Sequence, residues 1–135
     1  MKTVIAGVRQ VGAPGQELRP LYYTEICWIM DTLDDYHKIF PITEVISGTA
    51  LGVDRVGELW AAHRNIPIVP FIPDWNKQGK KAGHLRNAEM AEYGEALVAF
   101  WDNFSSGTKN MIDNMKKRNK MATIYNLTYE LEVKK

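Results

Sequence analysis

The chain has 135 residues, of which 45% are hydrophobic and 24% charged, and its formal net charge at pH 7 is +1. This length suits one domain over residues 1–135 with its own core, and the near-zero charge excludes a general attraction to nucleic acid. Cys27 is the only cysteine and cannot form an internal disulfide, and no apolar run approaches the length of a membrane span. The first residues lead into a predicted strand instead of a secretion signal. We therefore expect a cytoplasmic protein without a membrane partner.

Apolar runs that are typical of strands alternate with helical periodicity along the chain. Strands are predicted at residues 3–6, 44–47, 66–72, 96–101 and 122–127. Helices are predicted from near Pro20 and over residues 53–63, 85–93 and 107–118. This alternation predicts an α/β fold with a mainly parallel sheet of about five strands and helices on both faces. Residues 129–133 alternate like an extra C-terminal edge strand.

Two segments in the middle of the chain have unusual composition. Residues 66–72 are almost wholly apolar, which predicts a strand covered on both faces, while their prolines indicate an edge or an early end. Residues 74–84 contain three lysines, a histidine and two glycines, and we expect a long basic loop there.

Three glycine-containing segments follow predicted strands, at residues 7–9, 47–54 and 105–108. In a parallel sheet all three would meet at one rim, where glycine allows close approach and the first turn of a helix offers free N–H groups. Residues 105–108 are the best phosphate candidate, although a serine N-cap without a ligand explains them equally well. Neither they nor residues 47–52 have Walker or Gly-x-Gly-x-x-Gly spacing, which disfavours NTPase and dinucleotide sites. The histidines lack metal-ligand spacing.

Charged and aromatic residues beside these segments allow both a functional and a structural interpretation. Arg9 and Arg86 would clamp a phosphate, or are surface charges. Asp54 would accept a ribose hydroxyl, or stabilises the first turn of its helix. Trp75 or Trp101 would stack on a base.

Several motifs together are similar to the YspA-like branch of the SLOG superfamily. They are Ile5-Ala6-Gly7-Val8-Arg9, Ile46-Ser47-Gly48-Thr49-Ala50-Leu51-Gly52-Val53-Asp54-Arg55, Pro73-Asp74-Trp75, Gly79-Lys80-Lys81-Ala82-Gly83-His84-Leu85-Arg86-Asn87 and Ala99-Phe100-Trp101-Asp102 with Ser105-Ser106-Gly107-Thr108. Their order and spacing match over nearly the whole chain. The resemblance implies a Rossmann-like three-layer sandwich, expected with strand order 3-2-1-4-5, and a pocket for a nucleotide or nucleotide-derived ligand.

The ligand-binding residues that we expect are Gly7, Arg9, Ser47, Gly48, Thr49, Gly52, Asp54, Trp75, Arg86, Asn87, Asp102, Ser105, Ser106, Gly107 and Thr108. The chain departs from the usual pattern at Val8, which replaces a serine, and at Asn103, Phe104 and Ser106, which replace a glycine and two cations. These differences favour a less charged or more aromatic ligand than that of its relatives.

The same superfamily includes the Lonely-guy phosphoribohydrolases, which cleave the bond between a base and ribose monophosphate. Arg86-Asn87-Ala88-Glu89-Met90 is similar to part of their pattern, but their glutamate falls on Met111, which has no acid–base chemistry. The missing acid favours binding over hydrolysis. If the chain is an enzyme, Asp54, Glu89 and Arg86 are the catalytic candidates.

We therefore expect a protein that binds a nucleoside phosphate or ADP-ribose-like compound as a sensor, carrier or sequestering module. No cofactor is predicted beyond such a bound nucleotide. The alternatives are a nucleotide N-glycosidase and, as in the DNA-processing protein A relatives, a single-stranded DNA binder that uses Trp75 and the basic segment of residues 77–86. The sequence is also compatible with a homo-oligomer.

Overall fold

The computed structural model describes residues 1–12, 15 and 17–127, and its strands form one five-stranded parallel sheet. The strands are β1 (Lys2–Gly7), β2 (Glu44–Ser47), β3 (Ile68–Pro70), β4 (Ala96–Trp101) and β5 (Met121–Asn126). Their order in the sheet is β3-β2-β1-β4-β5, which confirms the predicted Rossmann-like order.

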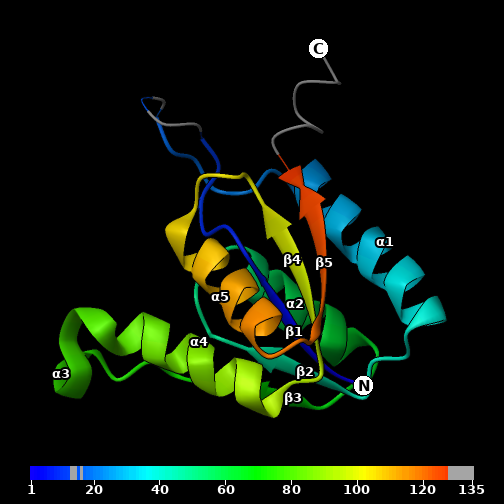
Figure 1. The fold of residues 1–135 in the computed structure, drawn as a ribbon. Coiled ribbons are helices and arrows are strands. Elements are labelled where there is room, and N and C mark those ends of the chain that lie inside the picture. Colours follow the sequence, from blue (N-terminus) through cyan, green and yellow to red (C-terminus); the bar gives the residue numbers. More distant parts are fainter. Residues whose placement is uncertain (13–14, 16, 128–135) are drawn as a thin grey trace.

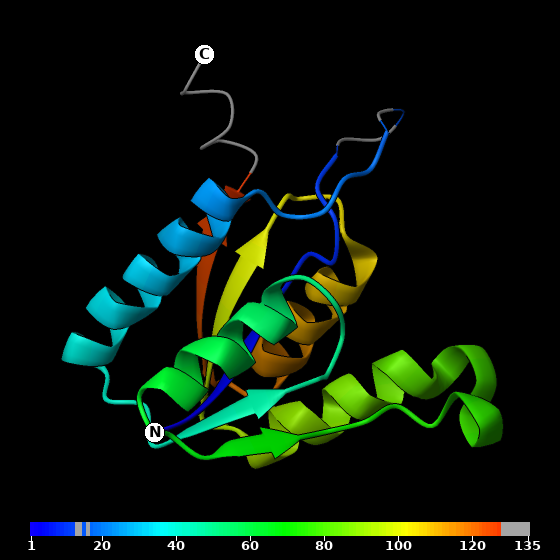
Figure 2. The same ribbon diagram turned by 180° about the vertical axis from the view of Figure 1, so that it is seen from behind.

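Helices cover both faces of this sheet (Figures 1 and 2). They are α1 (Tyr23–Ile39), α2 (Val53–His63), α3 (Trp75–Gln78), α4 (Ala82–Tyr93) and α5 (Ser106–Lys117), with a 3-10 turn, η1 (Gly79–Lys81), between α3 and α4. Helices α1 and α2 pack on one face and α4 and α5 on the other, so the three predicted layers are confirmed. Among the described residues, no helix is both long and apolar enough to cross a bilayer.

The central strands are buried on both faces, which explains their continuous apolar sequence. Successive side chains of a strand point to opposite faces, and Val4 of β1 packs among residues of α4 and α5 while Ile5 packs among residues of α1 and α2. Leu97 and Val98 of β4 divide in the same way. The rim at the carboxyl ends of β1, β2 and β4 is therefore held by strands that are largely buried.

The prediction for residues 66–72 is half correct. Strand β3 lies at the edge of the sheet, as its prolines indicated, but it has only three residues and is not covered on both faces. Ile68 keeps 36% of its surface exposed. The physical reason is that β3 pairs with β2 alone, and the helices extend over the middle of the sheet and not over this edge.

The prediction of a loop over residues 74–84 is wrong, because most of these residues are helical. Asp74 caps α3 by accepting the backbone N–H of Lys77 at 3.0 Å. The turn η1 then leads directly into α4, which begins three residues before the predicted helix. Helix α1 begins at Tyr23, slightly after the predicted Pro20. The alternating residues 129–133 lie outside the described part of the chain.

Candidate functional site

Two connected cavities open at the rim of the sheet, between β1, the β2–α2 turn, α4 and the start of α5. An inner pocket of about 80 Å³ continues into an outer cavity of about 630 Å³, and Arg9, Ala50, Arg86, Asn87, Ser105 and Gly107 line both. Ala6, Gly7, Asp54, Met90, Thr108 and Met111 complete the inner pocket. The outer cavity extends to Trp75, Ile72, Leu51 and Lys80.

Most of the residues predicted to bind a ligand come together here. Those that line one or both cavities are Gly7, Arg9, Gly48, Thr49, Asp54, Trp75, Arg86, Asn87, Ser105, Ser106, Gly107 and Thr108. They lie at or after the carboxyl ends of β1, β2 and β4 or on α4, apart from Trp75 on α3, so the parallel topology gathers most of them as the sequence predicted. Their contact with a ligand stays a prediction.

The other predicted residues are placed where they support the rim. The buried Ser47 donates its hydroxyl to Glu58 at 2.6 Å and accepts the backbone N–H of Thr49 at 3.0 Å. Gly52 has φ of 78°, and a Cβ there would collide with the backbone of Val8 and Arg9. Both residues therefore shape the β2–α2 turn without lining either cavity.

Asp102 organises the loop before α5. Its Oδ1 accepts the backbone N–H groups of Phe104 at 2.8 Å and Ser105 at 2.9 Å. The residue is buried and borders a third cavity of about 480 Å³, which shares Arg9 and Ser105 with the other two. These hydrogen bonds give Asp102 a structural role in the loop.

The start of α5 offers backbone donors to the cavities. Ser105 is the N-cap of α5, and its hydroxyl oxygen accepts the N–H of Thr108. These contacts are those expected of a structural N-cap. The N–H groups of Ser106 and Gly107 have no acceptor among the described residues. No described atom lies within 4 Å of the position of a Cβ on Gly107, so a ligand has room there.

Arg86 and Asn87 extend from α4 toward this helix end. Arg86 donates from Nη1 to the carbonyl of Gly48 at 2.5 Å and from Nε to Asn87 Oδ1 at 3.0 Å. The Asn87 amide in turn donates to the carbonyl of Gly107 at 3.2 Å. Burial lowers the pKa of Arg86, while nearby Asp54 acts in the opposite direction. Among the described residues, Arg86 Nη2 has no partner and is available to an anion.

Asp54 places a buried carboxyl group in the wall of the inner pocket. It is 6% exposed, and its Oδ2 accepts the backbone N–H of Ala50 at 3.1 Å. Burial raises the pKa of Asp54 to about 6, although the Ala50 N–H and the charge of Arg86 favour the ionised form. A carboxyl group perturbed in this way inside a pocket is a common feature of functional sites.

The outer cavity has an apolar side. Trp75 is 56% exposed, Ile72 is 76% exposed and Leu51 is 62% exposed, and all three line the cavity. Gly83 allows Trp75 to lie against α4, because a Cβ there would stand 3.3 Å from the indole ring. Helix α3, which carries Trp75, projects beyond the sheet at the far end of α4 (Figures 1 and 2).

The structure separates the remaining candidates. Glu89 is exposed and lines neither cavity, so only Asp54 and Arg86 of the three catalytic candidates face the site. Met111 is buried and lines the inner pocket, and its correspondence to the Lonely-guy glutamate stays a prediction. Within the described ranges, no group of three or more His, Cys, Asp or Glu residues is able to hold a metal ion.

Sequence reasoning missed several residues that line the cavities, among them Lys80, His84 and Met90. Lys80 and His84 lay in the stretch predicted as a loop, which hid their place beside Arg86. Met90 follows Arg86 by four residues, and helical spacing was a signal that both share one face of α4.

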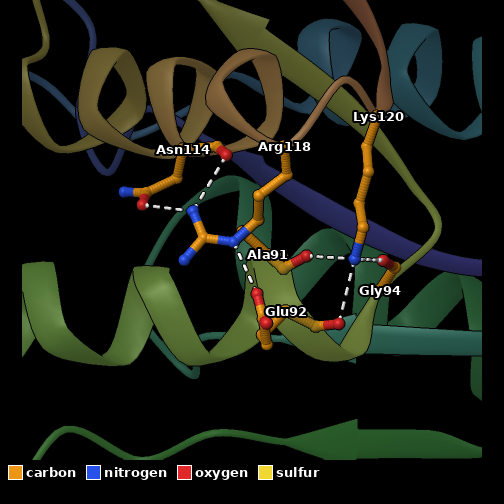
Figure 3. Close-up of polar contacts among 6 residues, drawn as sticks. All are labelled: Ala91, Glu92, Gly94, Asn114, Arg118 and Lys120. Carbon is orange, nitrogen blue, oxygen red and sulfur yellow. Dashed lines mark hydrogen bonds and ion pairs between the residues drawn. The ribbon is translucent and has the colours of Figure 1, made fainter.

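The other end of α4 is anchored by α5 and the residues that follow it (Figure 3). Lys120 Nζ donates to the carbonyls of Ala91, Glu92 and Gly94 at 2.7, 2.9 and 2.8 Å. Arg118 donates to Glu92 at 2.7 Å and lowers the pKa of that carboxyl group. These contacts fix the helix from which Arg86 reaches the site.

Comparison with known proteins places the chain in a family. The Gene 61 protein of Mycobacterium phage D29 is 32% identical to it over 90 residues, which cover 62% of this chain and 72% of that protein. No solved structure matches the chain. The family model described as the YspA, cpYpsA-related SLOG family matches residues 1–78, more than half of the chain, and confirms the predicted resemblance. The chain therefore belongs to the YspA, cpYpsA-related SLOG family.

Proposed function

We propose that the protein binds a nucleoside phosphate or an ADP-ribose-like ligand in the cavities at the rim, as a sensor, carrier or sequestering module. The observation that carries this proposal is the convergence of Arg9, Arg86 and the N-terminal end of α5 on one cavity. Membership of the SLOG family supports a role related to nucleotides.

The proposed phosphate position lies at the start of α5. The N–H groups of Ser106 and Gly107, unpaired within the described structure, face an end of the helix where the dipole favours negative charge. Arg86 Nη2 adds a cation with an unused donor, and Arg9 lines the same space. Backbone donors combined with guanidinium groups suit the oxygens of a phosphate.

The proposed position of the base lies in the outer cavity. A volume of about 630 Å³ falls within the range of small-molecule sites. Exposed Trp75, Ile72 and Leu51 form an apolar wall on which an aromatic ring would stack. A ligand with both a phosphate and a base uses both parts of the cavity.

The buried carboxyl group of Asp54 supports hydrolysis of an N-glycosidic bond as a second candidate function. In this reaction water adds to the anomeric carbon, the bond to the base breaks, and the base leaves with a proton. Asp54 lines the pocket and is suited to accept a proton from water above a pH of about 6. The resemblance to the hydrolases implies that their acid falls on Met111, which lines the same pocket and has no acid–base chemistry, so binding without turnover is the main proposal.

Calorimetric titration with AMP, ADP, ADP-ribose and unphosphorylated adenosine tests the main proposal, and chromatography of the same mixtures for released base tests the second. We expect the phosphorylated compounds to bind and adenosine to bind much more weakly. A single-stranded oligonucleotide that binds more tightly than every mononucleotide would favour the DNA alternative instead.

Gly107→Val is the variant that probes the phosphate position. Because no described atom outside the neighbouring residues and the backbone of α5 lies within 4 Å of a Cβ at Gly107, a valine has room for its Cβ and will extend into the cavity at the helix end. We expect affinity for AMP to fall by at least about tenfold, or ~1.4 kcal/mol, with the melting temperature nearly unchanged. Equal losses of affinity and stability would make this glycine a structural turn only.

A further inference from the structure

Asp54 is an unexpected residue in a pocket proposed to bind an anion. It lies at the second position of α2, and a carboxylate there would repel a phosphate. Its one hydrogen bond comes from Ala50, which precedes the helix, so the carboxyl group does not cap the first turn of α2. Asp54 Oδ1 has no hydrogen-bond partner among the described residues. Stabilisation of α2 therefore does not explain why a carboxyl group with one unpaired oxygen is buried here.

Among the described residues, no cationic side chain forms an ion pair with Asp54. Arg86 of α4 directs Nη1 to the carbonyl of Gly48 and forms no ion pair with Asp54. Arg55 of α2 pairs with Glu58 at 3.1 Å, and Arg9 approaches the pocket from the loop after β1. The carboxyl group thus stays buried, in a pocket wall, with one acceptor oxygen that no described residue uses.

A carboxylate oxygen accepts hydrogen bonds and donates none, so the ligand group that meets it must be a donor. Phosphate oxygens and the ring acceptors of a base do not qualify. The amino group of a base is also a donor, but the apolar wall proposed for the base lies in the outer cavity, whereas the inner pocket borders the proposed phosphate position at Gly107. The group nearest to the phosphate in a nucleotide is the sugar, whose donors are hydroxyl groups.

We propose that Asp54 binds the 2′ and 3′ hydroxyl groups of the ligand's ribose, so that the site selects ribonucleotides over deoxyribonucleotides. This proposal rests on the proposed function, since it orients a nucleotide whose phosphate lies at α5. In the free protein, the carboxylate is stabilised by one backbone N–H and by the charge of Arg86, and hydrogen bonds from ribose hydroxyl groups would further offset its desolvation. Asp54 is then a specificity-determining residue and not a source of phosphate affinity.

Calorimetric titration at pH 8 with AMP, 2′-deoxy-AMP and 3′-deoxy-AMP tests this inference. We expect the parent protein to bind AMP about tenfold more tightly than at least one of the deoxy forms, the scale of a hydrogen bond to a charged group. In Asp54→Asn, which keeps the size of the side chain, this ratio will fall to about a third of its parent value or less, because the hydrogen bond becomes neutral.

Asp113→Asn is the matched control, because Asp113 is an exposed carboxylate on α5 that pairs with Lys109 at 2.8 Å. It should leave the ratio unchanged. Equal binding of all three nucleotides by the parent protein would overturn the ribose inference and leave the proposed function intact. A ratio of AMP to deoxy-AMP affinity that is unchanged in Asp54→Asn would also overturn the ribose inference and leave the proposed function intact. Absence of binding by every nucleotide would instead overturn the proposed function and the inference together.

Discussion

The two ends of helix α4 use their polar groups in opposite ways. At its C-terminal end, Lys120 donates to three carbonyls that have no partner inside the helix, and Arg118 pairs with Glu92 (Figure 3). Cations near the last turn also interact favourably with the helix dipole. This end of α4 is complete without a ligand.

The other end of α4 leaves its polar groups incompletely paired. Arg86 uses two of its nitrogens within the described structure and leaves Nη2 open to a cavity. Across the pocket, the largely buried Asp54 keeps an oxygen that no described residue pairs. One end of α4 therefore stabilises the fold, whereas the other leaves a donor open to a cavity whose opposite wall carries the acceptor of Asp54 on α2. Substitutions at the two ends should therefore affect different measurements.

The largest effect is expected from Asp54→Asn on the free energy of unfolding. Burial raises the pKa of this carboxyl group to about 6, whereas in the unfolded chain it ionises near pH ~4. The folded parent binds the proton more tightly, so its stability falls as pH rises from about 4 to about 6. At pH 8 we expect the asparagine substitution to stabilise the protein by up to ~3 kcal/mol, since one pKa unit is ~1.4 kcal/mol.

Thermal or urea unfolding of the parent and Asp54→Asn between pH 3.5 and pH 8 measures this difference. The gain should shrink as pH falls through about 6 and vanish below ~4, where both states of the parent are protonated. A gain that is independent of pH would show that the asparagine acts through packing and not through removal of a buried charge.

Arg86→Ala is expected to have the next largest effect, on affinity. Loss of a hydrogen bond from a charged group should weaken binding of AMP by about 1.5–3 kcal/mol. Stability should change less, because Arg86 contributes one hydrogen bond to Gly48 and one to Asn87. Calorimetry at low salt measures the affinity, and an unchanged dissociation constant would remove Arg86 from the site.

Lys120→Met should lower stability and leave affinity nearly unchanged. The substitution removes a charged donor from three carbonyls, and that of the buried Ala91 is the hardest to hydrate. We expect the free energy of unfolding to fall by ~2 kcal/mol. Urea denaturation measures this loss. Weaker nucleotide binding by a fully folded Lys120→Met protein would mean that the two ends of α4 are coupled.

Arg118→Gln should have the smallest effect of these substitutions. The Glu92 carboxylate that it contacts is 75% exposed, so water and salt screen the pair. Because Arg118 also donates to Asn114, stability should fall slightly, by less than in Lys120→Met, and affinity should match that of the parent. The variant also serves as the arginine control for Arg86→Ala, and a loss of binding equal to that of Arg86→Ala would show a nonspecific effect of positive charge.

The sequence predicted the framework of the molecule because its signals are local. Apolar runs predicted all five strands, and the segments around Gly48 and Gly107 placed the turns at one rim. The contacts of Lys120 depend on residues 26 to 29 positions away, and no local pattern indicates them. The helical turn at Trp75 was missed because nearby glycines and lysines outweighed the single cap at Asp74.

The sequence predicted most of the residues that line the cavities but not their electrostatics. Parallel topology brings Arg9, Asp54 and Arg86 together once the strand order is known. Whether a carboxyl group is buried or a guanidinium group is paired depends on packing around it, which a pattern of residues does not specify. The raised pKa of Asp54 and the open nitrogen of Arg86 therefore required the three-dimensional structure.

Titration of AMP and ADP-ribose into the parent, Arg86→Ala and Lys120→Met proteins under identical conditions tests the contrast between the two ends of α4 most directly. We predict that the parent and Lys120→Met proteins bind at least one of these ligands with dissociation constants within about threefold of each other. Arg86→Ala should bind at least about tenfold more weakly while keeping nearly the stability of the parent. Failure of the parent to bind either ligand, or equal binding by the parent and Arg86→Ala, would contradict the account.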